Sequence, residues 1–229
     1  MEFDLKKQAG GILFILILAI SATAFVFILN KTPPENKPIS LGEVEIVGYE
    51  GADLSSINDF RENSIKGPQY IDIENYTLKV IGLVKEEKEY NYNEIIGRQT
   101  YSKVVTLNCV EGWSAKILWE GIILRELLAE ARPSSEANTI IFYAKDGYST
   151  SYPIDYIMNN DILLAYKMNN MTILPERGFP FQLVAEDKWG YKWIKWITKI
   201  EFSNNSEYRG FWESRGYANE GNLNESYYG

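Results

Sequence analysis

A single cysteine is the residue with the most distinctive chemistry in this sequence of 229 residues. Cys109 follows an apolar stretch at residues 104–107 that is typical of a strand. The next residues, 110–113, include Gly112, which permits a sharp turn. The pattern predicts a thiol presented where a strand opens into a turn, a common position for a functional side chain. The alternative is a structural cysteine, since a free thiol packs well in an apolar core.

Histidine is absent from the chain, and this absence excludes several kinds of site. Without imidazole there can be no Ser-His-Asp or Cys-His nucleophile system and no histidine-ligated zinc or haem. One cysteine also cannot form an internal disulfide or a cysteine-ligated iron–sulfur cluster. A soft metal bound by Cys109 therefore needs a cofactor to supply its other ligands. The net charge of −8 argues against a nucleic-acid partner, because phosphate backbones bind clustered Lys and Arg.

A run of 20 residues without charge, residues 10–29, is long enough to cross a hydrocarbon core of roughly 30 Å as a helix. A cleaved signal peptide is the alternative, but the apolar run continues past the small residues Ala22–Ala24. Lys6 and Lys7 before the run, and Asn-x-Ser/Thr sequons beyond it, favour a single-pass protein with an extracytoplasmic domain. The sequence thus predicts a membrane anchor at residues 1–30, a proline-rich linker at residues 31–45 and one domain at residues 46–229.

The predicted domain is rich in β-strands, and an apolar content of 45% is enough for a packed core. Runs of apolar and β-branched residues predict strands at residues 76–84, 103–110, 139–143, 162–166, 181–186 and 193–202. In the last of these, apolar residues from Ile194 to Phe202 alternate with polar ones. Leucines at helical spacing predict a helix at residues 124–131, and residues 145–147 (KDG) predict a tight turn between strands.

The sequence around Cys109 resembles the segment that carries the molybdenum-ligating cysteine in the sulfite oxidase superfamily of molybdopterin enzymes. The resemblance begins with residues 106–113 (TLNCVEGW) and spans about residues 60 to 223. Further motifs follow in the order found in that family: residues 119–121, 144–150, 178–181, 188–195, 210–213 and 216–217. Within the superfamily, residues 109–114 are most similar to the catalytic subunits of periplasmic methionine sulfoxide reductases. Several spaced motifs in one order favour the ligand interpretation of Cys109 over the structural one.

The resemblance implies an α+β, mostly β, mixed-sheet molybdopterin-binding domain, with molybdopterin carrying molybdenum as its cofactor. The chemistry that it implies is oxygen-atom transfer coupled to two electrons, with Cys109 as the metal ligand and catalytic residue. The cofactor-binding residues carried over from the family are Cys109, Ala144, Arg177, Gln182, Trp193, Ile194 and Lys195. Lys195 retains a cation that suits the pterin phosphate. Ala144, Arg177 and Gln182 replace the threonine, asparagine and arginine of the reductases.

The remaining candidate residues have simpler interpretations. Lys188 and Lys192 are expected to lie on a solvated polar strand face. Four tryptophans, Trp113, Trp119, Trp196 and Trp212, are expected to be core or half-buried packing residues.

Together these features predict a membrane-anchored molybdopterin-dependent oxidoreductase that acts on a small-molecule substrate such as an S-oxide or N-oxide. Sulfite is disfavoured because a dianion needs convergent cations, whereas Glu111 and Trp113 follow Cys109. The chain has no haem ligand pair or cluster motif, so electrons must come from a separate partner. A cofactor-free binding module that keeps the fold is the alternative, because the substitutions at Ala144 and Gln182 permit it.

Overall fold

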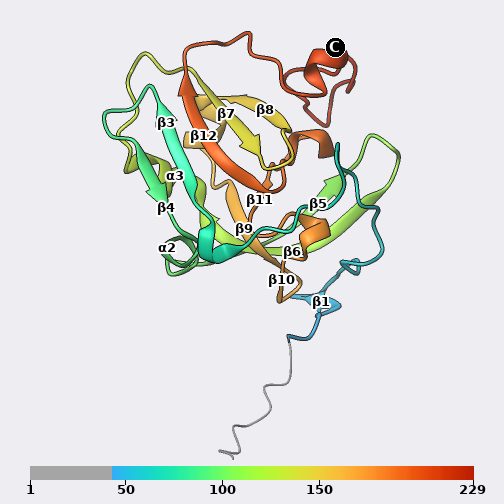
Figure 1. Cartoon of the computed structure of the whole chain (residues 1–229). Coiled ribbons are helices and arrows are strands. Elements are labelled where there is room, and N and C mark those ends of the chain that lie inside the picture. Colours follow the sequence, from blue (N-terminus) through green and yellow to red (C-terminus); the bar gives the residue numbers. More distant parts are fainter. Residues whose placement is uncertain (1–42) are drawn as a thin grey trace, which may run out of the picture. The chain divides into compact units, whose positions relative to one another are not determined.

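A computed structural model describes residues 43–229 of the chain (Figure 1). The predicted membrane helix at residues 10–29 and most of the predicted linker lie outside the described residues. Within residues 43–229, no helix is both long and apolar enough to cross a membrane.

Two five-stranded sheets form most of this part of the chain. The first sheet has the order β10-β9-β6-β5, and β11 also pairs with β9. Its strands are β5 (Tyr101–Asn108), β6 (Ser114–Ile123), β9 (Leu163–Met168), β10 (Met171–Thr172) and β11 (Gln182–Val184). The second sheet has the order β4-β3-β12-β7-β8. Its strands are β3 (Leu78–Gly82), β4 (Lys88–Tyr90), β7 (Thr139–Ala144), β8 (Ser149–Pro153) and β12 (Ile197–Ser203).

The second sheet is mixed, because β12 pairs parallel with β3 and antiparallel with β7. Figure 1 shows β12 lying between these two strands. A small antiparallel pair, β1 (Gly48–Tyr49) and β2 (Ala52–Asp53), precedes both sheets along the chain. The strands agree with the mostly β, mixed-sheet fold that the sequence predicts.

The helices are short. The α-helices are α2 (Tyr92–Ile96), α3 (Leu124–Ala129) and α4 (Ile154–Met158). The 3-10 turns are η1 (Ile73–Asn75), η2 (Pro175–Arg177), η3 (Gly190–Lys192) and η4 (Glu213–Arg215). A capping box starts α2, where the side chains of Asn91 and Glu94 each accept a hydrogen bond from the backbone N–H of the other. The predicted helix at residues 124–131 is confirmed as α3, which buries Leu124, Leu127 and Leu128.

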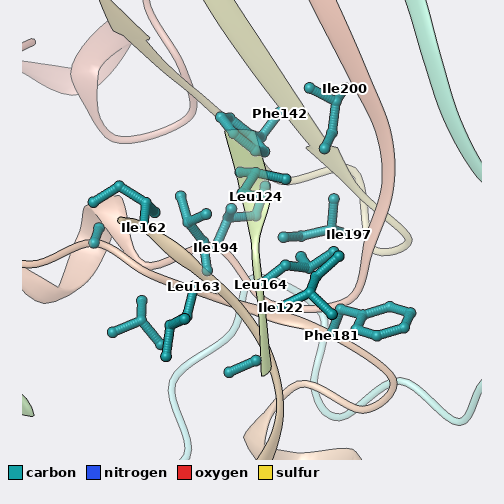
Figure 2. Packing of buried hydrophobic residues seen from close by; sticks show 14 of the residues in the cluster. Ile122, Leu124, Phe142, Ile162, Leu163, Leu164, Phe181, Ile194, Ile197 and Ile200 are labelled. Carbon is teal, nitrogen blue, oxygen red and sulfur yellow. The ribbon is translucent and has the colours of Figure 1, made fainter. Parts of the chain in front are cut away.

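One hydrophobic core joins the two sheets. Figure 2 draws members of it from both, among them Ile122 of β6, Leu164 of β9 and Phe142 of β7. All three side chains are at most 2% exposed. Burying a side chain of this size stabilises the fold by about 1.5–3 kcal/mol, so the core provides a firm base for the loops at the sheet ends.

The predicted strand at residues 193–202 is wrong in its first part. Residues Gly190–Lys192 form the turn η3, and β12 begins only at Ile197. Trp196 interrupts the extended backbone with a φ of +52°, in the left-handed region that a bulky residue rarely adopts. Its indole Nε1 donates a hydrogen bond of 2.7 Å to the carbonyl of Pro175, which joins this residue to η2.

Candidate active site

Cys109 lies in the turn of a hairpin. Strands β5 and β6 pair in a register that places Asn108 opposite Ser114, so residues 109–113 form the connection. The Cys109 N–H donates to the carbonyl of Trp113 at 2.9 Å, and the Gly112 N–H donates to the carbonyl of Cys109 at 3.1 Å. Gly112 has a φ of +86°, which glycine adopts without strain. The predicted strand-to-turn position of the thiol is confirmed.

The thiol is half-buried and faces a cavity of about 440 Å³, here called the Cys109 cavity. Pockets for small molecules commonly measure about 300–1,000 Å³. The Asn63 side-chain amide donates to Cys109 Sγ at 3.7 Å. Burial raises the pKa of the Cys109 thiol, while the backbone N–H groups of Glu111 and Val110 and the Asn63 amide oppose this rise. A metal that binds this sulfur must displace its proton.

Two cations, Lys195 and Arg177, also line the Cys109 cavity. Lys195 Nζ lies 2.9 Å from Glu62 Oε1. Burial lowers the pKa of Lys195, and the Glu62 carboxylate opposes this shift. Arg177 Nε donates to the carbonyl of Ile57 at 2.8 Å, and its guanidinium lies 4.3 Å from the centre of the Phe60 ring. Among residues 43–229 the two terminal nitrogens of Arg177 have no hydrogen-bond partner, so they can bind an anionic group in the cavity.

The structure brings six of the seven predicted cofactor residues to the same cavity. These are Cys109, Arg177, Gln182, Trp193, Ile194 and Lys195. Ala144 ends β7 and does not line the cavity; its neighbours Asp146 and Tyr148 do. Gly178 allows close packing here, because a Cβ at this position would lie 3.0 Å from the Lys195 side chain. The cofactor contacts of these residues remain predictions.

Two segments that sequence reasoning did not assign to the site also line the cavity. The first is residues 60–65, which supply both the Asn63 amide and the Glu62 carboxylate. Its only signal in the sequence is a cluster of polar and charged residues before the first long strand. The second contributes Trp212 and Tyr217 near the C-terminus.

The expectation of core or half-buried tryptophans is confirmed for Trp113, Trp119 and Trp196, whereas Trp212 is 36% exposed. Trp119 is fully buried in the core, as expected. Trp113, Trp196 and Trp212 also line the cavity, together with Trp193.

The solvated face expected for Lys188 and Lys192 is wrong, since their exposed fractions are 5% and 0%. The reason is that residues near the C-terminus cover both side chains and provide partners for them. Lys188 bonds to Asn222 and Lys192 to Glu213.

The donor atoms at this site suit a cofactor that brings its own metal ligands. Within residues 43–229, no group of three or more His, Cys, Asp or Glu residues is arranged to hold a metal ion. Cys109 offers one soft sulfur donor, while Lys195 and Arg177 offer positive charge in the same cavity. A pterin with a dithiolene and a phosphate matches all three features, because its sulfurs complete a soft metal site and its phosphate pairs with cations.

Comparison with known proteins gives the same assignment. Residues 65–212 match the family described as "Oxidoreductase molybdopterin binding domain". The uncharacterized oxidoreductase YuiH of Bacillus subtilis (strain 168) is 31% identical over 151 residues, which cover 66% of this chain and 76% of the relative. The protein-methionine-sulfoxide reductase catalytic subunit MsrP of Campylobacter jejuni is 27% identical over 227 residues, which cover 92% of this chain and 75% of the relative.

Among solved structures, the sulfane dehydrogenase SoxCD from Paracoccus pantotrophus superposes with a TM-score of 0.60 at 20% identity. The match covers 67% of this chain and 43% of that one, and at this identity it supports the fold alone. The family match covers more than half of the present sequence, and it favours the enzyme over the cofactor-free module. The chain therefore belongs to the oxidoreductase molybdopterin-binding domain family of the sulfite oxidase superfamily, and it is an oxidoreductase whose cofactor is molybdopterin with molybdenum.

Proposed function

We propose that this protein removes the oxygen atom from a small S-oxide or N-oxide, with Cys109 as the protein ligand to molybdenum. The observation that carries the proposal is the half-buried Cys109 thiol in a hairpin turn, facing a cavity that also contains Lys195 and Arg177. The similarity to a protein-methionine-sulfoxide reductase catalytic subunit over 92% of this chain supports the substrate class.

The charges near the thiol support an uncharged substrate over sulfite. Glu111 and Trp113 line the cavity beside Cys109, and the Trp113 indole donates to the Glu111 carboxylate at 3.3 Å. Arg61 also lines the cavity, but it shares an adjacent shallow groove with Asp59 and Glu111. With Lys195 and Arg177 assigned to the cofactor phosphate, Arg61 is the cation that residues 43–229 leave for a substrate in this cavity, whereas recognition of a dianion requires several convergent cations.

Molybdopterin, when bound, supplies the metal centre at which an oxygen atom and two electrons are exchanged. The reaction converts the oxide, two electrons and two protons into the reduced compound and water. Cys109 would hold the metal through its sulfur, which the β5–β6 hairpin keeps in place. The Asn63 amide donates toward the same sulfur and withdraws electron density from it. Lys195 and Arg177 would hold the pterin phosphate.

The membrane attachment is part of the proposal and rests on the sequence alone. Residues 10–29 form the anchor, residues 31–45 the linker, and the domain at residues 46–229 faces outward. A separate electron-transfer protein delivers the two electrons. Protease treatment of intact cells should digest the domain, and complete protection of residues 46–229 would rule out the outward orientation.

The test is to express the full chain with a molybdopterin supply and measure metal content and turnover. Protein that contains molybdenum should reduce dimethyl sulfoxide, methionine sulfoxide or trimethylamine N-oxide with a reduced dye as electron donor. Sulfite oxidation in the same preparation is the comparison. Molybdenum-containing protein that oxidises sulfite and reduces none of the oxides would refute the proposed substrate class.

A further inference from the structure

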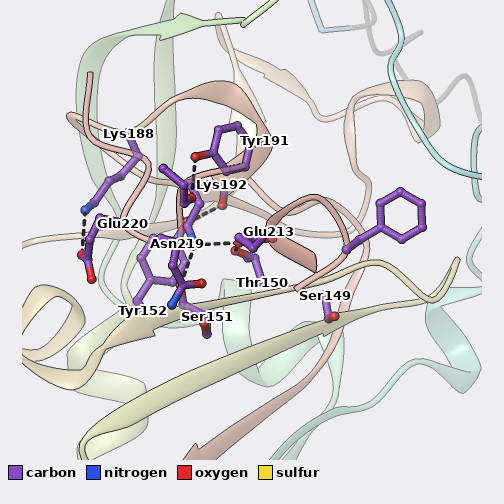
Figure 3. Close-up of polar contacts among 12 residues, drawn as sticks. Ser149, Thr150, Ser151, Tyr152, Lys188, Tyr191, Lys192, Glu213, Asn219 and Glu220 are labelled. Atoms are coloured by element: carbon purple, nitrogen blue, oxygen red, sulfur yellow. Dashed lines mark hydrogen bonds and ion pairs between the residues drawn. The ribbon is translucent and has the colours of Figure 1, made fainter. Parts of the chain in front are cut away.

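A fully buried ion pair lies beside the Cys109 cavity. Lys192 Nζ and Glu213 Oε1 are 2.7 Å apart, and both side chains have an exposed fraction of 0%. Figure 3 shows the contact, with Thr150 and Asn219 beside it. Lys192 ends η3, whereas Glu213 begins η4. The pair thus joins two segments that are 21 residues apart in the sequence.

The same pair also fastens a third element, strand β8. Lys192 Nζ donates to the carbonyl of Ser151 at 2.8 Å and to that of Asn219 at 2.7 Å. The Thr150 hydroxyl donates to Glu213 Oε1 at 2.5 Å. All three ammonium protons of Lys192 thereby have acceptors, which a buried lysine needs to remain charged.

Residues 210–229, here called the C-terminal wall, fit closely around this pair. A Cβ on Gly210 would lie 2.3 Å from the carbonyl oxygen of Ser149 and 2.6 Å from Glu213 Oε2. A Cβ on Gly221 would lie 2.7 Å from Lys192 Cγ. Only glycine fits at either position, so the backbone of the wall packs closely against the rest of the domain.

No large apolar side chain of this wall is buried in the core. The buried residues between 204 and 229 are Gly210, Glu213 and Gly221. None of them has a large apolar side chain to place in the core. The ion pair is therefore the fully buried attachment of the segment, alongside backbone hydrogen bonds such as Phe211 N–H to the carbonyl of Ser149 and Trp189 N–H to that of Gly221. Removing one charge of the pair would leave the other buried without a partner.

The wall places two aromatic rings in the Cys109 cavity. Trp212 and Tyr217 both line it, and their ring centres are 5.3 Å apart. Burial raises the pKa of Tyr217, and its tyrosine neighbours, Cys109 and Glu111 raise this pKa further. On the other side of the ion pair, Trp193–Lys195 directly follow Lys192 and also line the cavity.

We propose that Lys192 and Glu213 are positioning residues that fix Trp212 and Tyr217 as the substrate-facing wall, and that this wall limits the enzyme to small substrates. The substrate class rests on the proposed function above. The size limit follows from the position of these rings, because bulky side chains that line the same cavity as Cys109 restrict the groups that can approach the thiol.

A first experiment tests the wall without any enzymatic activity. Cys109 is the only cysteine, so thiol labelling of the full chain prepared without cofactor reports access to the cavity. Trp212→Ala and Lys192→Met should each increase the labelling rate with a bulky maleimide by about tenfold or more, because both open the wall. Iodoacetamide, a small reagent, should respond much less.

Two control variants separate positioning from loss of stability. Leu128→Ala removes a fully buried core side chain away from the cavity, so it should lower the melting temperature without raising the labelling rate of the native protein. The double variant Lys192→Met with Glu213→Gln leaves no unpaired charge, so its melting temperature should recover toward that of the wild type while its labelling rate stays raised, because the directional contacts are still missing. A Lys192→Met protein that is folded and labels at the wild-type rate would overturn the proposal.

A second experiment uses the molybdenum-loaded enzyme. The kcat/KM ratio for methyl p-tolyl sulfoxide over dimethyl sulfoxide should rise about tenfold in both Trp212→Ala and Lys192→Met, the scale on which pocket shape discriminates apolar groups. An unchanged ratio in both variants would refute the size limit. If the loaded wild type reduces neither sulfoxide but the labelling results hold, the proposed function is wrong and the positioning pair stands.

Discussion

Replacing Cys109 by serine separates a metal ligand from a structural cysteine. The substitution exchanges one sulfur for one oxygen at a half-buried position, so it removes little volume. A serine hydroxyl can still accept the hydrogen bond from Asn63. As a ligand, however, a hard oxygen is a poor replacement for a soft sulfur and changes the properties of the bound metal. We therefore expect oxide reduction to be lost while the domain stays folded.

The structure sets the size of the stability change. Burying a hydroxyl completely without a partner costs about 1–3 kcal/mol, and a half-buried hydroxyl with a donor should cost about 1 kcal/mol or less. For a domain of this size, 1 kcal/mol shifts the melting temperature by roughly 2–4 °C. The cofactor-free Cys109→Ser protein should thus melt within about 4 °C of the wild type.

The assay compares wild type, Cys109→Ser and the control Ser114→Ala, which alters an exposed residue at the far end of the same turn. Molybdenum and pterin content, dye-coupled sulfoxide reduction and thermal melting are measured for each. Pterin can remain bound to Cys109→Ser through Lys195 and Arg177, so activity should fall further than pterin content. Full activity in Cys109→Ser together with a clear loss of stability would identify a structural cysteine and refute the ligand assignment.

Three further predictions test the cavity and the fold. Lys195→Met should weaken retention of the pterin by about tenfold, measured as pterin content after dialysis, whereas Lys199→Met on β12 outside the cavity should not. Asn63→Ala should raise the pKa of the Cys109 thiol further, because the Asn63 hydrogen bond lowers this pKa. In a pH series on cofactor-free protein, the rise of the Cys109 labelling rate should therefore occur at a higher pH in the variant than in the wild type. Tyr76→Phe removes a buried hydrogen bond of 2.6 Å to β12 and should cost about 1 kcal/mol. Burial raises the pKa of Tyr76 above the unfolded value near 10. The contribution of Tyr76 to the free energy of unfolding is therefore complete below about pH 10 and is lost as the pH rises through the folded pKa. Unfolding measurements at alkaline pH should show a smaller loss of stability in Tyr76→Phe than in the wild type.

The sequence predicts strands well where one face is buried and the other is polar. The run of apolar and β-branched residues at 76–84 contains such a strand, β3, which buries Leu78 and Val80. Strand β6 was not predicted, because it lies between β5 and β9 and buries three consecutive residues, Ile117–Trp119, which removes the period of two. The strand predicted from residue 193 begins only at Ile197, because Trp196 has a left-handed backbone conformation. An apolar pattern in the sequence does not indicate such a conformation.

The candidate site was predictable where its residues lie within one motif. Cys109 and Trp193–Lys195 belong to such motifs, and the structure brings both to one cavity. The segment at residues 60–65 reaches the cavity only through the tertiary structure. The burial of Lys192 also depends on the tertiary structure. A lysine is expected at the surface unless a carboxylate pairs with it, and the partner of Lys192, Glu213, is 21 residues away in the sequence.

The C-terminal wall is attached through polar contacts because its two aromatic rings, Trp212 and Tyr217, line the cavity. Trp212 and Tyr217 face a cavity that has to admit cofactor and substrate, so these rings cannot also be buried in the core to anchor the chain. Apolar contacts are also non-directional and would tolerate small shifts of the segment. The Lys192 ammonium with its three acceptors, in contrast, fixes both distance and direction. A displacement of the segment would break these hydrogen bonds and leave a buried charge whose desolvation is no longer compensated. A buried ion pair contributes little net stability compared with apolar packing, so its value at this position lies in the geometry that it imposes on the cavity.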